Sequence, residues 1–381
     1  MIQQLNINQI RNLLSVSLQP SPYVNILYGF NGSGKTSILE AIHLLGVARS
    51  FRTSRIKPVI NKESETCTVF GRLGGSSGAI PIGVSRNIMD ESLLIRVSGE
   101  SLKSTSELVK LLPLQVINPD TFRLLEGSPK LRRCFIDWGV FHVKHQDFFP
   151  IWKRMQKALK QRNYLLRHGK INGSELASWN AEFEKSAKTI DELRSGYVQK
   201  LIPVFKQVLS ELLDIDDLNI QYYRGWDKER DLKEVLEYGL DRDIQSGYTH
   251  AGPQRADLRV RINRGNAIDI LSRGQLKLVV CALKLAQGFL YKEIQGKQCV
   301  FLVDDLPSEL DMVNRQKLCR LFQKMECQTF ITCVDKEALE SCWLPETEVK
   351  MFHVKHGQVE LDAPPGQQSF RRTESLEILN E

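Results

Sequence analysis

The chain has 381 residues, 42% of them hydrophobic and 25% charged, with 25 glycines, 14 prolines and a net charge of +7. This composition excludes a wholly disordered, collagen-like or purely coiled-coil chain, and the length predicts two or three lobes or one large domain carrying an insertion. No apolar stretch approaches the roughly 20 residues that cross a bilayer, and residues 1–5 lack the basic start of a signal peptide, so we expect a cytoplasmic protein with no membrane partner.

The first predicted elements are strands and one helix. Alternating apolar and polar residues at 2–7 and a short apolar run at 25–28 that ends at a glycine predict strands. Residues 36–45 follow with apolar side chains at helical spacing, and Gly46 is the expected end of this helix. Short β-type runs broken by glycines over 66–97 predict a series of hairpins.

Positive charge is concentrated in one part of the chain. Residues 120–170 hold twelve basic and four acidic side chains, so this window alone carries a larger excess than the whole chain. Such a stretch attracts polyanions, although many basic helix faces are only solvated. From 148 to 213 the pattern is helical, and the turn-forming residues 169–173 predict two antiparallel helices whose apolar stripe packs between them.

The β/α pattern returns after Tyr248. It predicts a buried strand over 299–303, a helix over 312–325 and a strand over 328–334. The sequence therefore predicts an α/β head split by an inserted antiparallel helical arm. The expected head covers 1–118 and 246–360, the arm covers 119–245, and 361–381 form a mobile tail.

The most specific motif occupies residues 29–36. It reads Gly-Phe-Asn-Gly-Ser-Gly-Lys-Thr and matches the P-loop pattern between a predicted strand and a predicted helix. Glycines allow backbone N–H groups to face phosphate, the Lys35 ammonium reaches the β- and γ-phosphates, and Thr36 supplies a hydroxyl ligand to Mg²⁺. The predicted nucleotide contacts are Gly29, Phe30, Asn31, Gly32, Ser33, Gly34, Lys35 and Thr36.

Two acids follow the buried strand at 299–303. The carboxyl end of this strand delivers Asp304 and Asp305 to the crevice where α/β sheets bind ligands. We expect Asp304 to hold Mg²⁺, directly or through water, and Asp305 to polarise the attacking water. Together with Lys35 they form the predicted catalytic set.

A serine signature precedes the acidic strand by about thirty residues. Residues 271–276 read Leu-Ser-Arg-Gly-Gln-Leu and open a predicted helix over 276–290, with Ser272 near its start. A serine hydroxyl and exposed N–H groups at a helix start form an anion site. The order of P-loop, serine signature and acidic strand resembles the ABC-type ATPases.

Further motifs narrow the resemblance to the RecF family, from the first residues to about Cys333. They are residues 10–13 (Ile-Arg-Asn-Leu), 27–43 around the P-loop, 49–53 (Arg-Ser-Phe-Arg-Thr), 127–133 (Gly-Ser-Pro-Lys-Leu-Arg-Arg) with the Asp-Trp pair at 137–138, and 249–257 (Thr-His-Ala-Gly-Pro-Gln-Arg-Ala-Asp). The resemblance implies an ABC/SMC-type P-loop ATPase head of the α/β class, split by the helical arm.

The resemblance also implies a function. RecF-family proteins are bacterial DNA repair and replication factors, so we expect an ATP-dependent homodimer that binds double-stranded DNA and ssDNA/dsDNA gap junctions, associated with the nucleoid. It would act with RecR and RecO, help to load RecA, and take part in recombination and the SOS response. Weak, DNA-stimulated ATP hydrolysis, with Mg²⁺ as the second cofactor, would release the dimer.

In that family two heads sandwich ATP. The resemblance implies that Lys35 and Thr36 of one chain share the nucleotide with Ser272 and Gly274 of the other. Asp311, at the end of residues 308–311 (Ser-Glu-Leu-Asp), would lie in the loop that communicates across the interface.

The chain departs from the family pattern at three places. Gln254 stands where the family usually has histidine, and its amide can still donate a hydrogen bond. The switch histidine common in ABC ATPases is absent, and Thr332 is its positional substitute. No phosphate-sensing glutamine is evident over 116–120.

The basic segment supplies the expected DNA contacts. They are Arg132, Arg133, Lys153, Arg154 and Lys157. Arg52 and Arg55 could reach phosphate or DNA, and solvated arginines after a helix are equally consistent with the sequence.

Two other patterns bear on metal binding and on redox state. The sequence Phe-His-Val-Lys-His occurs at 141–145 and again at 352–356. Each copy lacks the further ligands of a metal site, so the pattern favours packing over metal binding. The eight cysteines include no Cys-x-x-Cys pair, which indicates reduced thiols.

Two other function classes remain open on the sequence alone. One is the nucleotide-binding subunit of an ABC transporter, and the other is an SMC-like scaffold that binds ATP without hydrolysing it. The basic segment and helical arm argue against the transporter.

Overall fold

A computed structural model describes residues 1–75, 78–168 and 173–362. Its contacts divide the chain into two units, one made of Met1–Asn118 with Gln298 onward and the other of Pro119–Lys297. The first boundary falls at residue 118, as the sequence predicted, but the second does not fall at the predicted place. Residues 246–297, which the sequence assigned to the head, pack with the helical unit.

The first unit contains an antiparallel sheet with the strand order β2-β1-β4-β5-β6-β7. Its strands are β1 (Ile2–Ile10), β2 (Leu13–Leu18), β4 (Thr66–Gly75), β5 (Gly78–Asn87), β6 (Leu93–Val97) and β7 (Glu100–Ser101). The predicted hairpins are confirmed, since β4 pairs with β5 and β5 with β6.

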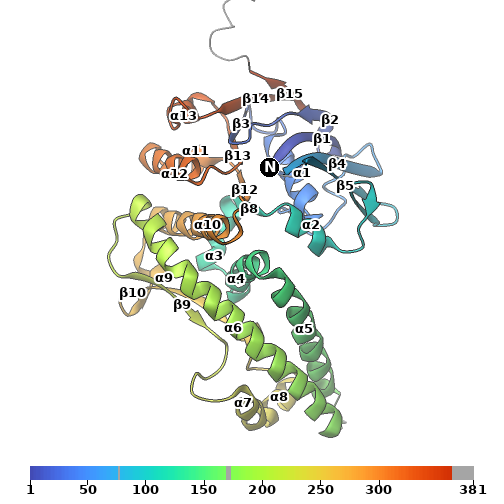
Figure 1. Cartoon of the computed structure of the whole chain (residues 1–381), viewed down its shortest axis with the longest axis vertical. Coiled ribbons are helices and arrows are strands. Elements are labelled where there is room, and N and C mark those ends of the chain that lie inside the picture. Colours follow the sequence, from blue (N-terminus) through green and yellow to red (C-terminus); the bar gives the residue numbers. More distant parts are fainter. Residues whose placement is uncertain (76–77, 169–172, 363–381) are drawn as a thin grey trace, which may run out of the picture. The chain divides into compact units, whose positions relative to one another are not determined.

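A second sheet of the same unit is mostly parallel and has the order β15-β14-β3-β13-β12-β8. Its strands are β3 (Val24–Tyr28), β8 (Leu114–Ile117), β12 (Val300–Val303), β13 (Thr329–Cys333), β14 (Val349–Lys355) and β15 (Gln358–Leu361). Segments from both ends of the chain therefore alternate within one sheet (Figure 1). This confirms the split α/β head.

Helices complete the first unit. They are α1 (Lys35–Val47), α2 (Thr105–Leu111), α11 (Leu306–Glu309), α12 (Met312–Met325) and α13 (Glu337–Glu340). The face of α1 toward the core carries Ile38, Leu39 and Ile42, which are fully buried. Helix α1 contacts strands of both sheets, so it fills the space between them.

Gly46 does not end helix α1, contrary to the sequence prediction. The helix continues to Val47, and Ala48 closes it in a left-handed conformation with its N–H bonded to the carbonyl of Leu44. A Cβ on Gly46 would lie 2.5 Å from Leu114 Cδ1. This glycine is therefore required by close packing against β8 and not by a turn.

The second unit is mostly helical. Its helices are α3 (Arg123–Glu126), α4 (Pro129–Val143), α5 (His145–Arg167), α6 (Gly173–Leu212), α7 (Leu232–Tyr238), α8 (Leu240–Ser246), α9 (Ala267–Ile270) and α10 (Arg273–Gln295), with 3₁₀ turns at Pro119–Phe122 and Pro253–Arg255. Helices α5 and α6 contact each other along the predicted arm (Figure 1). Residues 169–172 of the predicted turn, and the predicted tail from 363 on, lie outside the described residues.

A small sheet explains why the second boundary differs from the prediction. It has the order β11-β10-β9, from strands Gly265–Asn266, Asp257–Ile262 and Leu218–Tyr223. Strand β9 follows the arm in sequence, and β10 pairs with it antiparallel over six residues. Helix α10 packs along α6 and α4. These partners bind residues 246–297 to the helical unit.

The repeated Phe-His-Val-Lys-His sequence packs among aromatic rings in both places. Near the first copy, the His142 ring lies 4.4 Å from the Trp138 ring and 5.9 Å from that of Tyr291. Near the second, His353 stacks on Tyr28 at 4.9 Å. The packing interpretation of both copies accords with these contacts.

His142 makes the stability of the second unit depend on pH. Burial, and to a lesser degree the charge of His145, lower its pKa from 6.5 to about 3. Because the folded pKa of this base is depressed, the unfolded chain binds a proton below about pH 6.5 that the folded chain does not, so stability falls as pH falls. From pH 7 to pH 5 the loss is about 2 kcal/mol.

The variant His142→Gln cannot take up this proton. We expect its free energy of unfolding, measured with urea, to fall by about 2 kcal/mol less than that of the wild type between pH 7 and pH 5. The exposed His168 gives the matched control, His168→Gln, which should follow the wild type. Equal pH dependence in all three proteins would contradict the assignment.

Candidate nucleotide site

The P-loop folds as a glycine turn between β3 and α1. Gly29, Gly32 and Gly34 have φ of 143°, 79° and 122°, a region that side chains disfavour. A Cβ on Gly29 would stand 2.2 Å from the carbonyl oxygen of Val354, so this glycine allows β14 to approach the loop closely. Strand β3 and helix α1 border the loop as the sequence predicted.

Asn12, from the turn between β1 and β2, holds the loop in shape. Its amide nitrogen donates to the carbonyls of Gly32 and Ser33 at 3.2 and 3.0 Å, and its amide oxygen accepts from the Ser37 hydroxyl at 3.1 Å. These contacts give a structural role to residues 10–13. The sequence connected those residues to the site only through the family resemblance.

Lys35 folds over the loop. Its Nζ donates to the carbonyl oxygens of Gly29 at 2.6 Å and Phe30 at 3.0 Å, and the side chain is buried. Burial lowers the pKa of Lys35, while Asp305 and Asp304 raise it. An ammonium held by neutral carbonyls beside the N–H groups of a helix start suits the charge of a polyphosphate.

Asp304 meets the P-loop helix directly. The Thr36 hydroxyl donates to Asp304 Oδ1 at 2.8 Å, although the two residues are 268 positions apart. The backbone N–H of Asp304 bonds to the carbonyl of Ile117, which continues the pairing of β12 with β8. A hydroxyl and a carboxylate oxygen this close are the hard oxygen ligands that Mg²⁺ prefers, so these residues fit the predicted ion.

Asp305 follows in an unusual conformation. Its φ is 53° and ψ is 47°, the left-handed region, and its N–H donates to the Thr332 hydroxyl at 2.7 Å. Thr332 in turn donates to Asp304 Oδ1 at 2.8 Å. The two acids and Thr332 thus lie together, and the Thr332 side chain is engaged by both acids.

Ser272 caps helix α10. Its Oγ accepts from the N–H of Gln275 at 3.3 Å, and its own N–H donates to Gln275 Oε1 at 2.9 Å, a reciprocal capping box. The helix begins at Arg273, three residues before the predicted start. A Cβ on Gly274 would meet no heavy atom within 4 Å, so the space beside this glycine is open.

Asp311 caps helix α12. Its Oδ1 accepts from the N–H of Asn314 at 3.0 Å and its Oδ2 from the Asn314 side chain at 2.6 Å. These hydrogen bonds lower the pKa of Asp311. The carboxylate is exposed, and it fixes the start of α12 close after the two acids.

Arg132, one of the predicted DNA contacts, is engaged within the chain. Its guanidinium bonds Asp257 through Nε at 2.7 Å and Nη2 at 3.2 Å, and Nη1 contacts the carbonyls of Leu124, Leu125 and Gly127. Arg133 is also engaged, since its Nη1 donates to the Ala256 carbonyl at 2.9 Å. Burial lowers the pKa of Arg133. Both side chains hold the 249–257 loop in place.

The other three predicted DNA contacts lie at the surface. Lys153, Arg154 and Lys157 are exposed on α5. The Lys153 ammonium lies 4.3 Å from the centre of the Phe149 ring, and that of Lys157 lies 6.0 Å from the Trp179 ring. Neutral rings do not cancel these positive charges, so the charges remain able to attract an anion.

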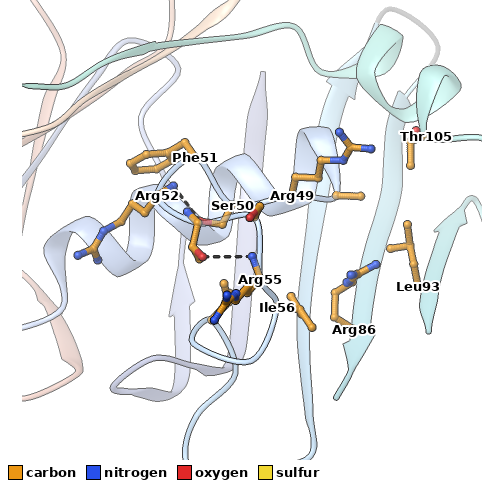
Figure 2. Close-up of a pocket in the computed structure, with 13 residues that line it drawn as sticks. Arg49, Ser50, Phe51, Arg52, Arg55, Ile56, Arg86, Leu93 and Thr105 are labelled. Atoms are coloured by element: carbon orange, nitrogen blue, oxygen red, sulfur yellow. Dashed lines mark hydrogen bonds between the residues drawn. The ribbon is translucent and has the colours of Figure 1, made fainter. Parts of the chain in front are cut away.

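An arginine-lined pocket of about 600 Å³ follows helix α1 in the first unit. Figure 2 shows Arg49 and Arg86 on the side of Leu93 and Thr105, while Arg52 extends in the opposite direction. Arg55 completes the set, and none of the described residues that line the pocket is acidic. The sequence named Arg52 and Arg55 as phosphate or DNA candidates and contained Arg49 only within the family motif at 49–53. It missed Arg86, because that residue comes from the distant strand β5.

The loop that carries Arg49, Arg52 and Arg55 is anchored by a buried acid. Glu40 accepts two hydrogen bonds from Arg11 at 2.8 Å each and one from the Ser50 hydroxyl. Ser50 Oγ accepts from the N–H of Arg52 at 2.9 Å, and Arg52 Nη1 lies 4.0 Å from Glu40 Oε2. The Glu40 carboxylate is thereby engaged chiefly by Arg11 and Ser50, so the pocket surface stays positive.

The arrangement can bind a nucleoside triphosphate with a divalent ion. Lys35 and the loop N–H groups suit phosphate, Thr36 and Asp304 suit Mg²⁺, and Asp305 stands next to them as a base or water-orienting group. Among the described residues, no helix is long and apolar enough to cross a membrane. All eight cysteines are free of disulfides within the same part of the chain.

Replacement of Gly29 by alanine tests the loop geometry. We expect Gly29→Ala to lose about 1–3 kcal/mol or more of stability, because the methyl group meets the Val354 carbonyl and φ is unfavourable. Binding of a fluorescent ATP analogue should fall with it. Gly83→Ala is the control, since its nearest neighbours lie at 3.9 Å or beyond. Thermal unfolding and nucleotide titration measure both variants. Equal stability and equal nucleotide affinity of Gly29→Ala and Gly83→Ala would contradict the prediction.

The chain is similar over most of its length to proteins of known family. Residues 1–360 match the model described as the RecF/RecN/SMC N terminal domain. The chain is 55% identical over 359 residues to the DNA replication and repair protein RecF of Pseudomonas aeruginosa (strain LESB58), covering 94% of this chain and 97% of the relative. The RecF of Pseudomonas entomophila (strain L48) is 55% identical over 362 residues, with the same coverage.

Solved structures agree with the sequence relatives. The recombination mediator protein RecF of the RecFOR pathway, solved with ATP, is 26% identical with a TM-score of 0.82, covering 95% of this chain and 97% of that one. An Smc head bound to the C-terminal winged-helix domain of ScpA gives a TM-score of 0.57 at 14% identity, covering 95% and 96%, and shows likeness of fold alone. The SMC-type ATPase fold predicted from the motifs is confirmed, and the chain belongs to the RecF family.

Proposed function

We propose that this chain is an ATP-dependent DNA-binding protein of recombinational repair and replication. The observation that carries the proposal is the junction of Thr36 with Asp304 at 2.8 Å beside the P-loop lysine. That junction combines phosphate and Mg²⁺ ligands within one unit. The relatives named DNA replication and repair protein RecF supply the biological setting.

ATP hydrolysis serves as a switch in this proposal. Lys35 neutralises the β- and γ-phosphates, Thr36 and Asp304 hold Mg²⁺, and Asp305 orients the attacking water. Bound Mg²⁺ stabilises the charge that develops on the transferred phosphoryl group. Turnover is weak and is stimulated by DNA, which suits a protein that must stay bound until its partners arrive.

ATP brings two chains together. The Ser272 hydroxyl and the open Gly274 lie at the start of a 23-residue helix, whose N–H groups favour negative charge. We propose that they complete the phosphate site of the second chain, with Asp311 at the same interface. Hydrolysis removes the shared γ-phosphate and lets the homodimer separate.

DNA binds through exposed positive charge on both units. On α5 the contacts are Lys153, Arg154 and Lys157, and the arginine pocket after α1 adds a second phosphate-binding surface. Phosphate contacts carry no sequence information, so the protein would select DNA by structure, such as a duplex next to a single-strand gap. Arg132 is left out of this proposed surface, because its guanidinium pairs with Asp257 at 2.7 Å.

The partners follow from the named relatives. Two of the solved neighbours are described as the recombination mediator protein RecF of the RecFOR pathway. We propose that this chain likewise acts with RecR and RecO in the cytoplasm, on the nucleoid, to promote RecA loading during the SOS response. The transporter alternative is set aside because the chain belongs to the RecF family.

The variant Lys35→Met tests the nucleotide switch. It removes the ammonium that faces phosphate and should weaken ATP–Mg²⁺ binding by about tenfold or more. In the wild type, ATP should raise the molecular mass seen by light scattering to that of a dimer and tighten binding to gapped duplex DNA. Both effects should be absent in the variant.

Two further variants show whether these effects depend on the P-loop and on hydrolysis. Lys350→Met changes a lysine that bonds the Gln19 carbonyl outside the P-loop, and it should behave as the wild type. Asp305→Asn should bind ATP and form the dimer without turnover. A non-hydrolysing scaffold would instead show equal DNA residence times for the wild type and Asp305→Asn.

Charge reversal on α5 tests the first DNA surface. Changing Lys153, Arg154 and Lys157 to Glu should weaken DNA binding. The negative slope of log affinity against log salt should become shallower by about 3, because about three phosphate contacts are lost. Lys185, Lys200 and Lys206 of α6 are also exposed, and their reversal is the control with the same change of charge. An unchanged affinity and slope in the first variant would remove α5 from the DNA surface.

The arginine pocket is tested separately. In the double variant Arg49→Gln and Arg55→Gln, the negative slope of log DNA affinity against log salt should become shallower by about 2. The affinity for ATP in the absence of DNA should not change. The control Arg72→Gln and Arg96→Gln alters two exposed arginines of strands β4 and β6 outside the pocket lining. If ATP affinity falls while the DNA slope is unchanged, the pocket binds nucleotide instead.

A further inference from the structure

Thr332 lies between the two halves of the nucleotide site. It belongs to β13, the strand that separates β3, which leads into the P-loop, from β12, which leads into the acids. Its side chain is only 1% exposed. By its position in the sequence, Thr332 substitutes for the switch histidine of ABC ATPases, and a contact between its hydroxyl and the γ-phosphate is the alternative role to test.

The hydrogen bonds of Thr332 leave it no proton for phosphate. The N–H of Asp305 is a donor, so Thr332 Oγ1 accepts in that contact at 2.7 Å. The carboxylate of Asp304 in its ionised form is an acceptor, so Thr332 Oγ1 donates in the contact at 2.8 Å. A hydroxyl has one proton, and here it points at Asp304.

The same two bonds fix the direction of both acids. Asp304 still follows the sheet, because its N–H pairs with the Ile117 carbonyl of β8. Asp305 leaves the sheet in the left-handed region, and its N–H turns to β13, where the Thr332 hydroxyl is the acceptor. A side-chain oxygen thus allows a chain reversal at the residue where the sheet ends.

Asp304 Oδ1 accepts a second hydroxyl, that of Thr36, at 2.8 Å. Two donors on one oxygen hold the carboxylate plane and leave Oδ2 as the oxygen less engaged by these side chains. The carboxylate is therefore oriented by side chains of the protein itself, and such preorganisation lowers the free energy needed to assemble a metal site.

We propose that Thr332 is a positioning residue for ATP hydrolysis, which orients Asp304 toward Mg²⁺ and holds Asp305 in place, and that it is not a sensor of the γ-phosphate. The inference rests on the proposed function, since it assigns a role within that reaction. Thr332 acts through the two acids and does not itself touch the nucleotide.

The test compares three proteins: the wild type, Thr332→Ser, which keeps the hydroxyl, and Thr332→Val, which keeps the shape and removes it. The measurements are the turnover number at saturating ATP–Mg²⁺, and the affinities for ATP and ADP with Mg²⁺ and with EDTA, by calorimetry. Amide hydrogen exchange at Asp305, followed by mass spectrometry of its peptide, reports on the hydrogen bond itself. Thermal unfolding confirms that each variant is folded.

We expect Thr332→Ser to stay within about twofold of the wild type. Thr332→Val should turn over about tenfold more slowly, because a group that orients the acids is lost. It should also need more Mg²⁺ for half-maximal ATP binding, while its affinity in EDTA and its ratio of ATP to ADP affinity are unchanged. Exchange at Asp305 should be faster. If Thr332→Val does not fold, Thr332→Ala is measured in its place.

Three outcomes would overturn the inference. If Thr332→Val equals the wild type in turnover and Mg²⁺ dependence, the hydroxyl has no role. If Thr332→Ser is as slow as Thr332→Val, packing of the methyl group matters and not the hydrogen bonds. If the variant loses only its preference for ATP over ADP, Thr332 senses phosphate. A wild type that hydrolyses no ATP would overturn the proposed function as well, which separates that failure from the other three.

Discussion

One carboxylate oxygen governs the geometry of the nucleotide site. Asp304 Oδ1 accepts hydroxyl protons from Thr36 of α1 and Thr332 of β13, each at 2.8 Å. Both bonds require that β3, β13 and β12 end near one level of the sheet. The register supplies this, because β13 pairs in parallel with β3 up to Tyr28 and with β12 up to Val303. Hydrogen bonds within the protein thus join the phosphate-binding and acidic parts of the site.

The hydrogen bond between Thr36 and Asp304 joins two segments of the first unit that are separated in sequence by the inserted second unit. Thr36 and Asp304 are separated by the whole second unit, so their contact closes a loop of 268 positions. The entropy of loop closure grows only slowly with length. The insertion also has its own small sheet, its own helix contacts and its own buried apolar cluster.

The sequence predicted those parts of the site that local chemistry specifies. The P-loop and the buried strand before Asp304 each follow a short local pattern, and the serine signature at Ser272 gains its meaning from its order with these two motifs. Three features could not be found this way. The hydrogen bonds of Thr332 and the role of Asn12 depend on neighbours distant in sequence, and Gly46 resembles a helix stop although its packing against Leu114 is what requires it.

The basic segment also shows that sequence patterns do not reveal contacts between residues distant in the chain. Residues 120–170 carry a large positive excess, but the fold neutralises part of it with acids from outside that window. Arg162 is fully buried with Asp243 at 2.8 Å, and Arg132 pairs with Asp257. Arginine suits such sites, because its planar fork satisfies several acceptors at once and it stays protonated when buried. Lysine lacks this geometry, and Lys153 and Lys157 of α5 remain at the surface, where water solvates them and dissolved anions screen their charge. The charge that can attract a polyanion is therefore carried by these exposed side chains and not by the arginines that a buried carboxylate already neutralises.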